Sequence, residues 1–184
     1  LTHAGQAYHG PSGNETENEA LRRVAQHERD RMLSVASVLS DADVPGATPD
    51  AFEISVGSTP TMAAFKHAER AGFRVTEIRP GNYVMHDAMQ VALGAASLND
   101  CALTVLTTVV STQTKPDGTH RAFIDAGKKV FTTDTGSGTD GHGIALADAA
   151  TMQPHPGPHL DGRSCGHGLL TISGAAAPPG AHPL

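Results

Sequence analysis

The sequence predicts an α/β unit followed by an antiparallel β unit, and three observations support this fold class. Helix-like and strand-like segments alternate in the first half, which favours parallel strands with right-handed crossovers, as in a (β/α) barrel or a doubly wound sheet. From Cys101 onward many of the apolar residues are β-branched, which is typical of strands. Asp117 and Gly118 lie between two strand candidates, and this dipeptide favours a hairpin turn and therefore antiparallel pairing.

The first predicted element is one long helix from Glu15 to about Ser40. Asn14 and Glu17 have the spacing of a capping box, in which two side chains satisfy free backbone amides at a helix start. Apolar residues then recur at helical spacing, at Leu21, Val24, Met32, Val35, Ala36 and Leu39. We therefore expect a helix that buries one face.

Shorter elements are predicted after this helix. Residues 41–50 are rich in turn formers, and residues 51–56 (AFEISV) predict a short buried strand. Residues 61–72 (TMAAFKHAERAG) predict a second helix with Gly72 as its C-terminal cap. Residues 73–79 (FRVTEIR) predict a second strand, which completes the helix, strand, helix, strand order.

The second half is predicted to be antiparallel β. Residues 101–112 (CALTVLTTVVST) predict a long strand, and residues 115–120 (KPDGTH) predict a turn. Residues 121–127 (RAFIDAG) and 128–134 (KKVFTTD) are short strand candidates. Beyond these the chain is rich in Gly, Pro and His, and the pattern does not define particular helices or strands there.

Composition narrows the class of protein. The 184 residues are 39% hydrophobic, which is enough for one ordinary domain or parts of two. The net charge of −6 and the absence of a Lys/Arg cluster argue against a nucleic-acid or anionic membrane partner, and favour a small molecule. No apolar run spans a bilayer and no signal peptide is apparent, and two distant cysteines fit a reducing cytoplasm.

Two turns are candidates for binding an anion. Residues 55–61 (SVGSTPT) lie where a strand leads into a helix, and residues 77–83 (EIRPGNY) follow the next predicted strand. Backbone amides at helix starts favour anions, and Gly81 permits close approach of a ligand at the position where the next helix is expected to begin. The two turns could therefore hold one phosphate together. The simpler alternative is that Ser58, Thr59 and Thr61 only cap a helix.

Four ordered motifs carry a resemblance to a known family. They are THAGQAY (2–8), SVGSTPT (55–61), TEIRPGNYVMHD (76–87), and TVLTTVVST (104–112) with DAGKKVFTTDTG (125–136). Together they resemble the eukaryotic-type D-serine dehydratases and D-threonine aldolases, which are pyridoxal-phosphate enzymes with an alanine-racemase-like barrel. The resemblance implies the closing part of a (β/α)8 barrel over residues 1–95, followed by an antiparallel D-serine dehydratase-like β domain over 96–184, incomplete at its end.

The resemblance also implies the cofactors. Pyridoxal 5'-phosphate would lie at the mouth of the barrel, and a divalent metal, Zn or Mn, would lie near the substrate hydroxyl. In the family the cofactor's lysine lies near the start of the barrel, and the metal ligands lie close to the C-terminus. Neither is visible here, so we expect an internal or C-terminal fragment of a longer enzyme, with the metal ligands unknown.

Individual residues follow from the matched motifs. The first turn supplies the first candidates for the phosphate, and the resemblance places amides of the second turn on the same phosphate. Arg79 resembles the arginine that faces the pyridine nitrogen in alanine racemase, and Tyr83 is the alternative for that position. Either residue could instead be a packing or surface residue. The resulting cofactor candidates are Gly57, Ser58, Thr59, Arg79, Gly81, Asn82 and Tyr83.

His3 and Tyr8 are the candidates for the substrate side of the site, because they belong to the motif THAGQAY. The family form of this motif has a second His and a Ser where Gln6 and Ala7 stand here. This departure affects recognition of the substrate hydroxyl rather than the cofactor site.

None of the four lysines has a placement that suits the cofactor's lysine. Lys66 is predicted on a charged helical face, and Lys115 lies in a turn. Lys128 and Lys129 open a predicted strand after a glycine. A lysine that bonds to the cofactor must be held near it with a depressed pKa, and no exposed position provides this.

The tail offers a second interpretation, because imidazole and thiolate are good zinc ligands. Its candidates are His142, His155, His159, His167, His182 and Cys165. Their spacing is irregular, so a solvated tail is the alternative. Residues 164–172 (SCGHGLLTI) instead resemble a family stretch that reads Ser-Glu-Glu-His-Gly, in which Cys165 and Gly166 replace the two acidic residues.

Two classes of function remain open from the sequence. The first is a pyridoxal-phosphate-dependent lyase that acts on a small D-hydroxyamino acid in the cytoplasm, either as a D-threonine aldolase or as a D-serine dehydratase. The parent enzyme could be a homodimer in this case. The second is a truncated or degenerate fragment that keeps an anion-binding barrel edge without chemistry.

Overall fold

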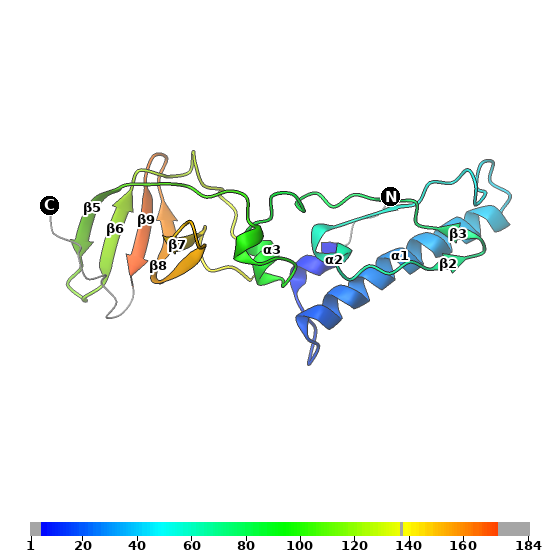
Figure 1. The fold of residues 1–184 in the computed structure, drawn as a ribbon, viewed down its shortest axis with the longest axis horizontal. Helices are drawn as coiled ribbons and strands as arrows, with labels where there is room; N and C mark the ends of the chain where they lie inside the picture. The colour runs from blue at the N-terminus through cyan, green and yellow to red at the C-terminus, as the bar shows by residue number, and fades with distance from the viewer. Residues whose placement is uncertain (1–4, 137, 173–184) are drawn as a thin grey trace. The chain divides into compact units, whose positions relative to one another are not determined.

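The computed structural model describes residues 5–136 and 138–172, and the chain forms two compact units, residues 1–100 and 101–184 (Figure 1). In the described residues no helix is both long and apolar enough to cross a bilayer. The elements of the first unit are, in order, η1 (Gly5–His9), α1 (Glu17–Asp41), β1 (Ser55–Val56), α2 (Thr59–Met62), β2 (Glu69–Arg70), β3 (Phe73–Arg74), β4 (Glu77–Ile78), α3 (Ala88–Ala92) and η2 (Leu98–Asp100).

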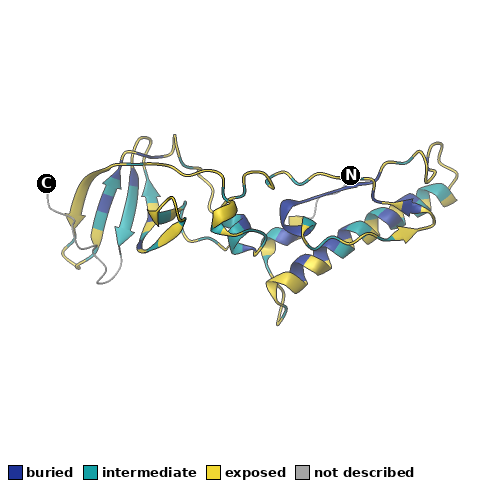
Figure 2. Cartoon of the chain, viewed as in Figure 1, coloured by how far each residue is buried: buried dark blue, intermediate teal, exposed yellow. Residues whose placement is uncertain are grey.

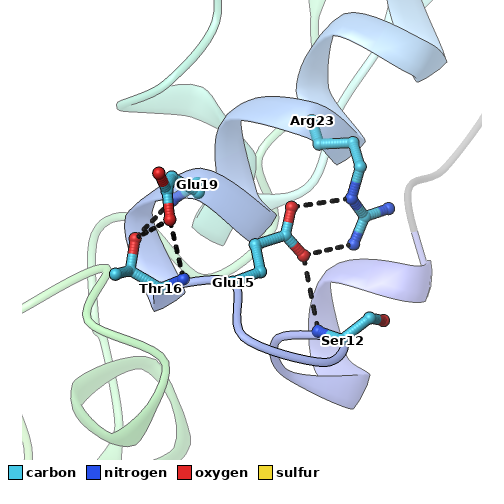
Figure 3. Close-up of polar contacts among 5 residues, drawn as sticks. All are labelled: Ser12, Glu15, Thr16, Glu19 and Arg23. Carbon is cyan, nitrogen blue, oxygen red and sulfur yellow. Dashed lines mark hydrogen bonds and ion pairs between the residues drawn. The ribbon is translucent and has the colours of Figure 1, made fainter.

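The start of α1 is fixed by a capping box (Figure 3). The amide of Glu19 donates to the Thr16 hydroxyl at 3.3 Å, and the amide of Thr16 donates to the Glu19 carboxylate at 2.8 Å. The prediction of a long helix is confirmed, but its capping pair, Asn14 and Glu17, is wrong by two residues. Thr16 and Glu19 have the same spacing, and they make both bonds.

The core of the first unit forms where α1 packs on the strands. The buried face of the helix meets the strand residues in one cluster, and dark blue positions recur along α1 in Figure 2. Phe52 and Phe73 add an edge-to-face ring contact, with centroids 6.2 Å apart. The cluster contains Leu33, Ala36, Ile54, Val56, Phe73 and Val75.

β1 and β4 are parallel neighbours, as the alternation of elements predicted. Ser55 is in register with Glu77, and the amide of Arg79 continues the pairing by donating to the Val56 carbonyl at 2.9 Å. In the described residues of this unit, β1 and β4 form a parallel sheet of two strands. Two strands do not show a closed barrel, so the barrel stays a prediction.

The predicted helix over residues 61–72 is wrong. α2 covers only Thr59–Met62, and Gly72, with a φ of +79°, lies in the turn between β2 and β3 instead of capping a helix. Arg29 donates to the Lys66 carbonyl at 2.6 Å, so α1 holds an oxygen that a continuing helix would need. The predicted strand 73–79 is correspondingly divided into β3 and β4.

The second unit is an antiparallel sheet of five strands, in the order β5-β6-β9-β8-β7. The antiparallel prediction and the turn at residues 115–120 are confirmed by the pairing of β5 with β6. β5 is fully exposed, whereas β6 and β9 carry buried residues (Figure 2). The strands are β5 (Val109–Thr114), β6 (His120–Ile124), β7 (Ile144–Asp148), β8 (Gln153–Arg163) and β9 (Gly168–Ile172).

Two predictions for this unit are wrong. The long strand over 101–112 is reduced to β5, and residues 128–130 form a turn because Val130 and Phe131 both donate to the Gly127 carbonyl at 2.9 Å. The tail, for which no elements were predicted, supplies β7, β8 and β9. β8 contains three prolines, and the irregular register between β7 and β8 accommodates strand residues that cannot donate.

Two motifs of the second unit lie against each other. A Cβ on Gly127 would lie 2.5 Å from the His167 amide nitrogen and 2.6 Å from the Ser164 carbonyl oxygen. The amide of Lys128 also donates to the Ser164 carbonyl at 3.0 Å. The segment DAGKK therefore packs directly on the segment SCGHG, and glycine at position 127 permits the approach.

Candidate functional site

The two predicted anion-binding turns lie side by side in the first unit. Gly57 and Ser58 directly follow β1, and Arg79 directly follows β4, its parallel neighbour. A Cβ on Gly57 would lie 2.7 Å from the carbonyl carbon of Arg79, so the two backbones are in close contact there. The amide of Asn82 donates to the Thr59 hydroxyl at 2.8 Å and joins the turns a second time.

The backbone of Gly57 is also held from the other side. Its amide donates to Oε1 of Glu28, on α1, at 3.1 Å in a buried hydrogen bond. Glu28 is 6% exposed. Two amides that the sequence assigned to the phosphate, those of Gly57 and Asn82, therefore have protein acceptors in this structure.

The hydroxyls of the first turn bond to one another. Ser58 Oγ and Thr61 Oγ1 are 2.8 Å apart, and the Thr61 hydroxyl donates to the Ser58 carbonyl at 3.1 Å. Ser58 precedes α2 without making a side-chain cap to it, so the simple capping alternative does not describe its side chain. Ser58 and Thr61 are both buried, at 1% and 0% exposure.

Three amides at these turns fit the oxygen atoms of a phosphate. In residues 5–136 and 138–172, the amides of Ser58, Thr59 and Gly81 donate no hydrogen bond, and Ser58 and Thr59 are buried. Gly81 is exposed, and an added Cβ would meet nothing within 4 Å. Buried amides without acceptors are costly, and a bound anion would satisfy them. Pyridoxal phosphate would supply such an anion, so the donors present fit this group.

The second turn is not a helix start, which corrects the expectation for Gly81. The following helix, α3, begins only at Ala88, and the side chain of Asp87 caps it by accepting from Gln90. Asn82 instead donates from its side chain to Asp87 at 2.6 Å. The residues between form turns, so the second turn contributes single amides rather than a helix terminus.

Arg79 and Tyr83 were the alternatives for the contact to the cofactor ring. Arg79 pairs with Glu77, with Nη2 to Oε2 at 2.6 Å, and about half of its side chain is exposed. Hydrogen bonding within this pair raises the pKa of Arg79 and lowers that of Glu77, so both stay charged near neutral pH. Tyr83 is 59% exposed. Their roles stay predictions.

The substrate-side motif lies partly outside the described residues. His3 is one of the residues that the structure does not describe. Tyr8 is part of η1, which contacts both α1 and α2. Ala7 is buried against Leu21 and Val24 of α1, and this anchors η1 on that helix.

Neither the lysines nor the tail histidines form a site in the described residues. Lys66, Lys128 and Lys129 are exposed and Lys115 is half-buried, and Lys66 lies in a loop instead of on the predicted helix. His182 lies outside the described residues. Across residues 5–136 and 138–172, no three His, Cys, Asp or Glu side chains come together as metal ligands. A zinc cluster is therefore not found in that part.

Glu28 was missed by the sequence analysis, although a signal for it exists. The buried face of α1 also carries Leu21, Val24, Ala25, Leu33 and Ala36. Glu28 falls on the same face, seven residues after Leu21 and eight before Ala36. A carboxylate within an apolar helical stripe is unusual, and it indicates a buried polar contact.

Comparison with known proteins identifies relatives along nearly the whole chain. Residues 102–182 match the family described as putative serine dehydratase domain. D-threo-3-hydroxyaspartate dehydratase from Delftia sp. (strain HT23) is 32% identical over 179 residues, which is 96% of this chain and 43% of that protein. D-serine dehydratase from Dictyostelium discoideum is 36% identical over 83 residues, which is 45% of this chain and 20% of that protein. The chain thus spans less than half the length of these relatives.

Solved structures agree with this relationship. The Delftia D-threo-3-hydroxyaspartate dehydratase matches with a TM-score of 0.73 at 32% identity, over 94% of this chain and 42% of that one. A variant of that enzyme has been solved in a metal-free form. D-threonine aldolase from Filomicrobium marinum matches with a TM-score of 0.54 at 19% identity, over 93% of this chain and 39% of that one, which shows a shared fold alone.

Proposed function

We propose that this chain is part of a lyase that dehydrates a D-hydroxyamino acid with pyridoxal phosphate. The family match of residues 102–182, to the putative serine dehydratase domain, supports this. The observation that carries the proposal is the 32% identity to D-threo-3-hydroxyaspartate dehydratase over 96% of the chain. The aldolase is 19% identical and supports the fold alone, so the more similar dehydratase favours dehydration over cleavage of the carbon skeleton.

The turns at β1 and β4 would hold the cofactor's phosphate. The amides of Ser58, Thr59 and Gly81 supply donors from two neighbouring strand ends, and the Ser58 hydroxyl can add another by turning away from Thr61. Backbone amides bind a dianion without requiring a lysine. Gly57 and Asn82 would act differently from the sequence expectation, by fixing the two turns to each other and to α1.

Pyridoxal phosphate, when bound, withdraws electrons from the α-carbon of an amino acid and so makes loss of its β-hydroxyl feasible. Arg79, with Tyr83 as the alternative, would contact the ring nitrogen, and the charge on Arg79 would keep that nitrogen unprotonated. His3 and Tyr8 would lie on the substrate side. The cofactor's lysine is expected outside this sequence, because three of the four lysines here are exposed and the fourth is half-buried.

The other expectations for the parent enzyme are part of this proposal. A divalent metal, Zn or Mn, would bind near the substrate hydroxyl, which the metal-free form of the Delftia relative supports. The first unit would belong to a (β/α)8 barrel and the second to its β domain. A small D-amino acid would be the partner, and the enzyme would act in the cytoplasm as a homodimer.

The test is a product analysis with the full protein that contains this chain. D-threo-3-hydroxyaspartate, D-serine and D-threonine are each supplied with pyridoxal phosphate and a divalent metal, and the L-isomers serve as controls. A dehydratase releases ammonia and a 2-oxo acid from the D-isomers. Release of glycine and an aldehyde would instead establish an aldolase, and no turnover of any D-isomer would leave the non-catalytic alternative.

A further inference from the structure

A buried carboxylate on α1 reaches the backbone of the first anion turn. Glu28 is 6% exposed and accepts from the Gly57 amide at 3.1 Å across 29 residues of chain. Its neighbours on the buried face of α1, such as Ala25 and Leu33, are apolar. Burial of a carboxylate costs several kcal/mol unless it accepts hydrogen bonds, so Glu28 at this position depends on donors such as the Gly57 amide.

The bond from Glu28 acts on a backbone that is already constrained on its other side. Gly57 packs against Arg79, where a Cβ would lie 2.7 Å from the carbonyl carbon. The next residue, Ser58, is 1% exposed and has extended backbone angles, with φ at −157° and ψ at 147°. The Gly57 amide belongs to the peptide between positions 56 and 57, so the acceptor that α1 provides fixes the peptide that leads into Gly57 and Ser58.

The contacts continue from Gly57 into the second turn. Thr59 accepts from the Asn82 amide at 2.8 Å, so one hydrogen-bonded path joins α1 to both turns. The amides that stay available for a phosphate, those of Ser58 and Thr59, directly follow the amide that Glu28 binds. A rotated peptide at Gly57 would therefore turn these donors away from a common anion.

We propose that Glu28 is a positioning residue that fixes the Gly57 peptide, so that the amides of Ser58 and Thr59 converge on the cofactor's phosphate. The inference rests on the proposed function, because it assigns Glu28 to the same phosphate site. Glu28 acts through its acceptor oxygen and not through its negative charge, since a second negative charge would repel the phosphate. Glutamine should therefore replace it, and leucine should not.

Three variants of the full protein test this assignment. Glu28→Leu removes the acceptor and keeps the volume, whereas Glu28→Gln keeps an oxygen that can accept from Gly57. Asp30→Asn is the control, because it removes an exposed carboxylate from the same helix. The measurements are the thermal unfolding midpoint, hydrogen exchange in the peptide that contains Gly57, and the dissociation constant of pyridoxal phosphate.

Glu28→Leu leaves the Gly57 amide without this acceptor, so it should exchange that amide about tenfold faster and bind pyridoxal phosphate about tenfold more weakly. Glu28→Gln should stay within about threefold of the parent in both, and Asp30→Asn should change neither.

Two results would overturn the inference: unchanged exchange and affinity in Glu28→Leu, or a loss in Glu28→Gln as large as in Glu28→Leu. Failure of the proposed function has a different signature. The parent protein would then bind no pyridoxal phosphate, while exchange at Gly57 would still report whether Glu28 fixes this peptide.

Discussion

Gly57 lies directly against the backbone of Arg79, where a Cβ would be 2.7 Å from the Arg79 carbonyl carbon and 2.8 Å from its amide nitrogen. This approach is possible only for glycine, because real Cβ atoms do not come so close to rigid backbone. The close backbone contact between the two candidate turns therefore depends on glycine at position 57. Gly81, in the second turn, has no such neighbour within 4 Å.

Gly57→Ala should therefore separate β1 from β4 and destabilise the protein by about 1–3 kcal/mol, the usual range for added volume in a packed site. Gly81→Ala is the matched control and should change the free energy of unfolding by less than about 0.5 kcal/mol. Denaturant unfolding of both variants measures the difference. Equal stability of the two variants would mean that the contact between Gly57 and Arg79 does not exist.

The second unit offers a parallel test. Gly127→Ala would place a Cβ 2.5 Å from the His167 amide nitrogen and should cost about 1–3 kcal/mol in the free energy of unfolding. Gly166→Ala, in the same contact region, meets nothing within 4 Å and should be nearly neutral. Urea unfolding, followed by the circular dichroism of the sheet, distinguishes them. A neutral Gly127→Ala would show that DAGKK does not pack on SCGHG.

Asp125 should make the stability of the second unit depend on pH. The Thr107 hydroxyl at 2.6 Å and the Thr108 amide at 2.9 Å donate to its carboxylate and lower the pKa of Asp125 in the folded state. A lowered folded pKa gives stability that is present above the ordinary value of about 4 and is lost as the pH falls through the folded pKa.

The expected result is that the denaturant concentration at half-unfolding decreases as the pH is lowered from about 5 to about 2. This decrease should be less steep in Asp125→Asn. Thr107→Val removes the largest cause of the lowered pKa and should also reduce the slope. If both variants reproduce the slope of the parent protein, these hydrogen bonds do not hold Asp125 in its charged form.

Local patterns in the sequence predicted part of the fold correctly. The apolar periodicity located α1, and Asp117-Gly118 located the turn between β5 and β6. A helix was predicted over residues 61–72 because their composition favours one. The prediction was wrong because Arg29, on α1, donates to the Lys66 carbonyl that a continuing helix would need. β7 to β9 were missed because sheet pairing brought a tail rich in glycine and proline into strands that local propensity does not favour.

The site could be predicted only as far as its positions along the chain. SVGSTPT and EIRPGNY follow neighbouring strands, and their adjacency was confirmed by the pairing of Ser55 with Glu77. The sequence did not indicate which hydrogen-bond acceptor each amide has. The acceptor for Gly57 is Glu28, which lies 29 residues earlier on a helix, and only packing brings the two together. Which residues bind the cofactor stays a prediction.

Whether the two turns hold the phosphate of pyridoxal phosphate is measured most directly by the cofactor affinity of Ser58→Ala in the full protein. We expect a loss of binding free energy of about 1–3 kcal/mol, the scale for a hydrogen bond to a charged group, with the reaction type unchanged. The contrary result would be a dissociation constant equal to that of the parent protein, whether or not turnover is lost.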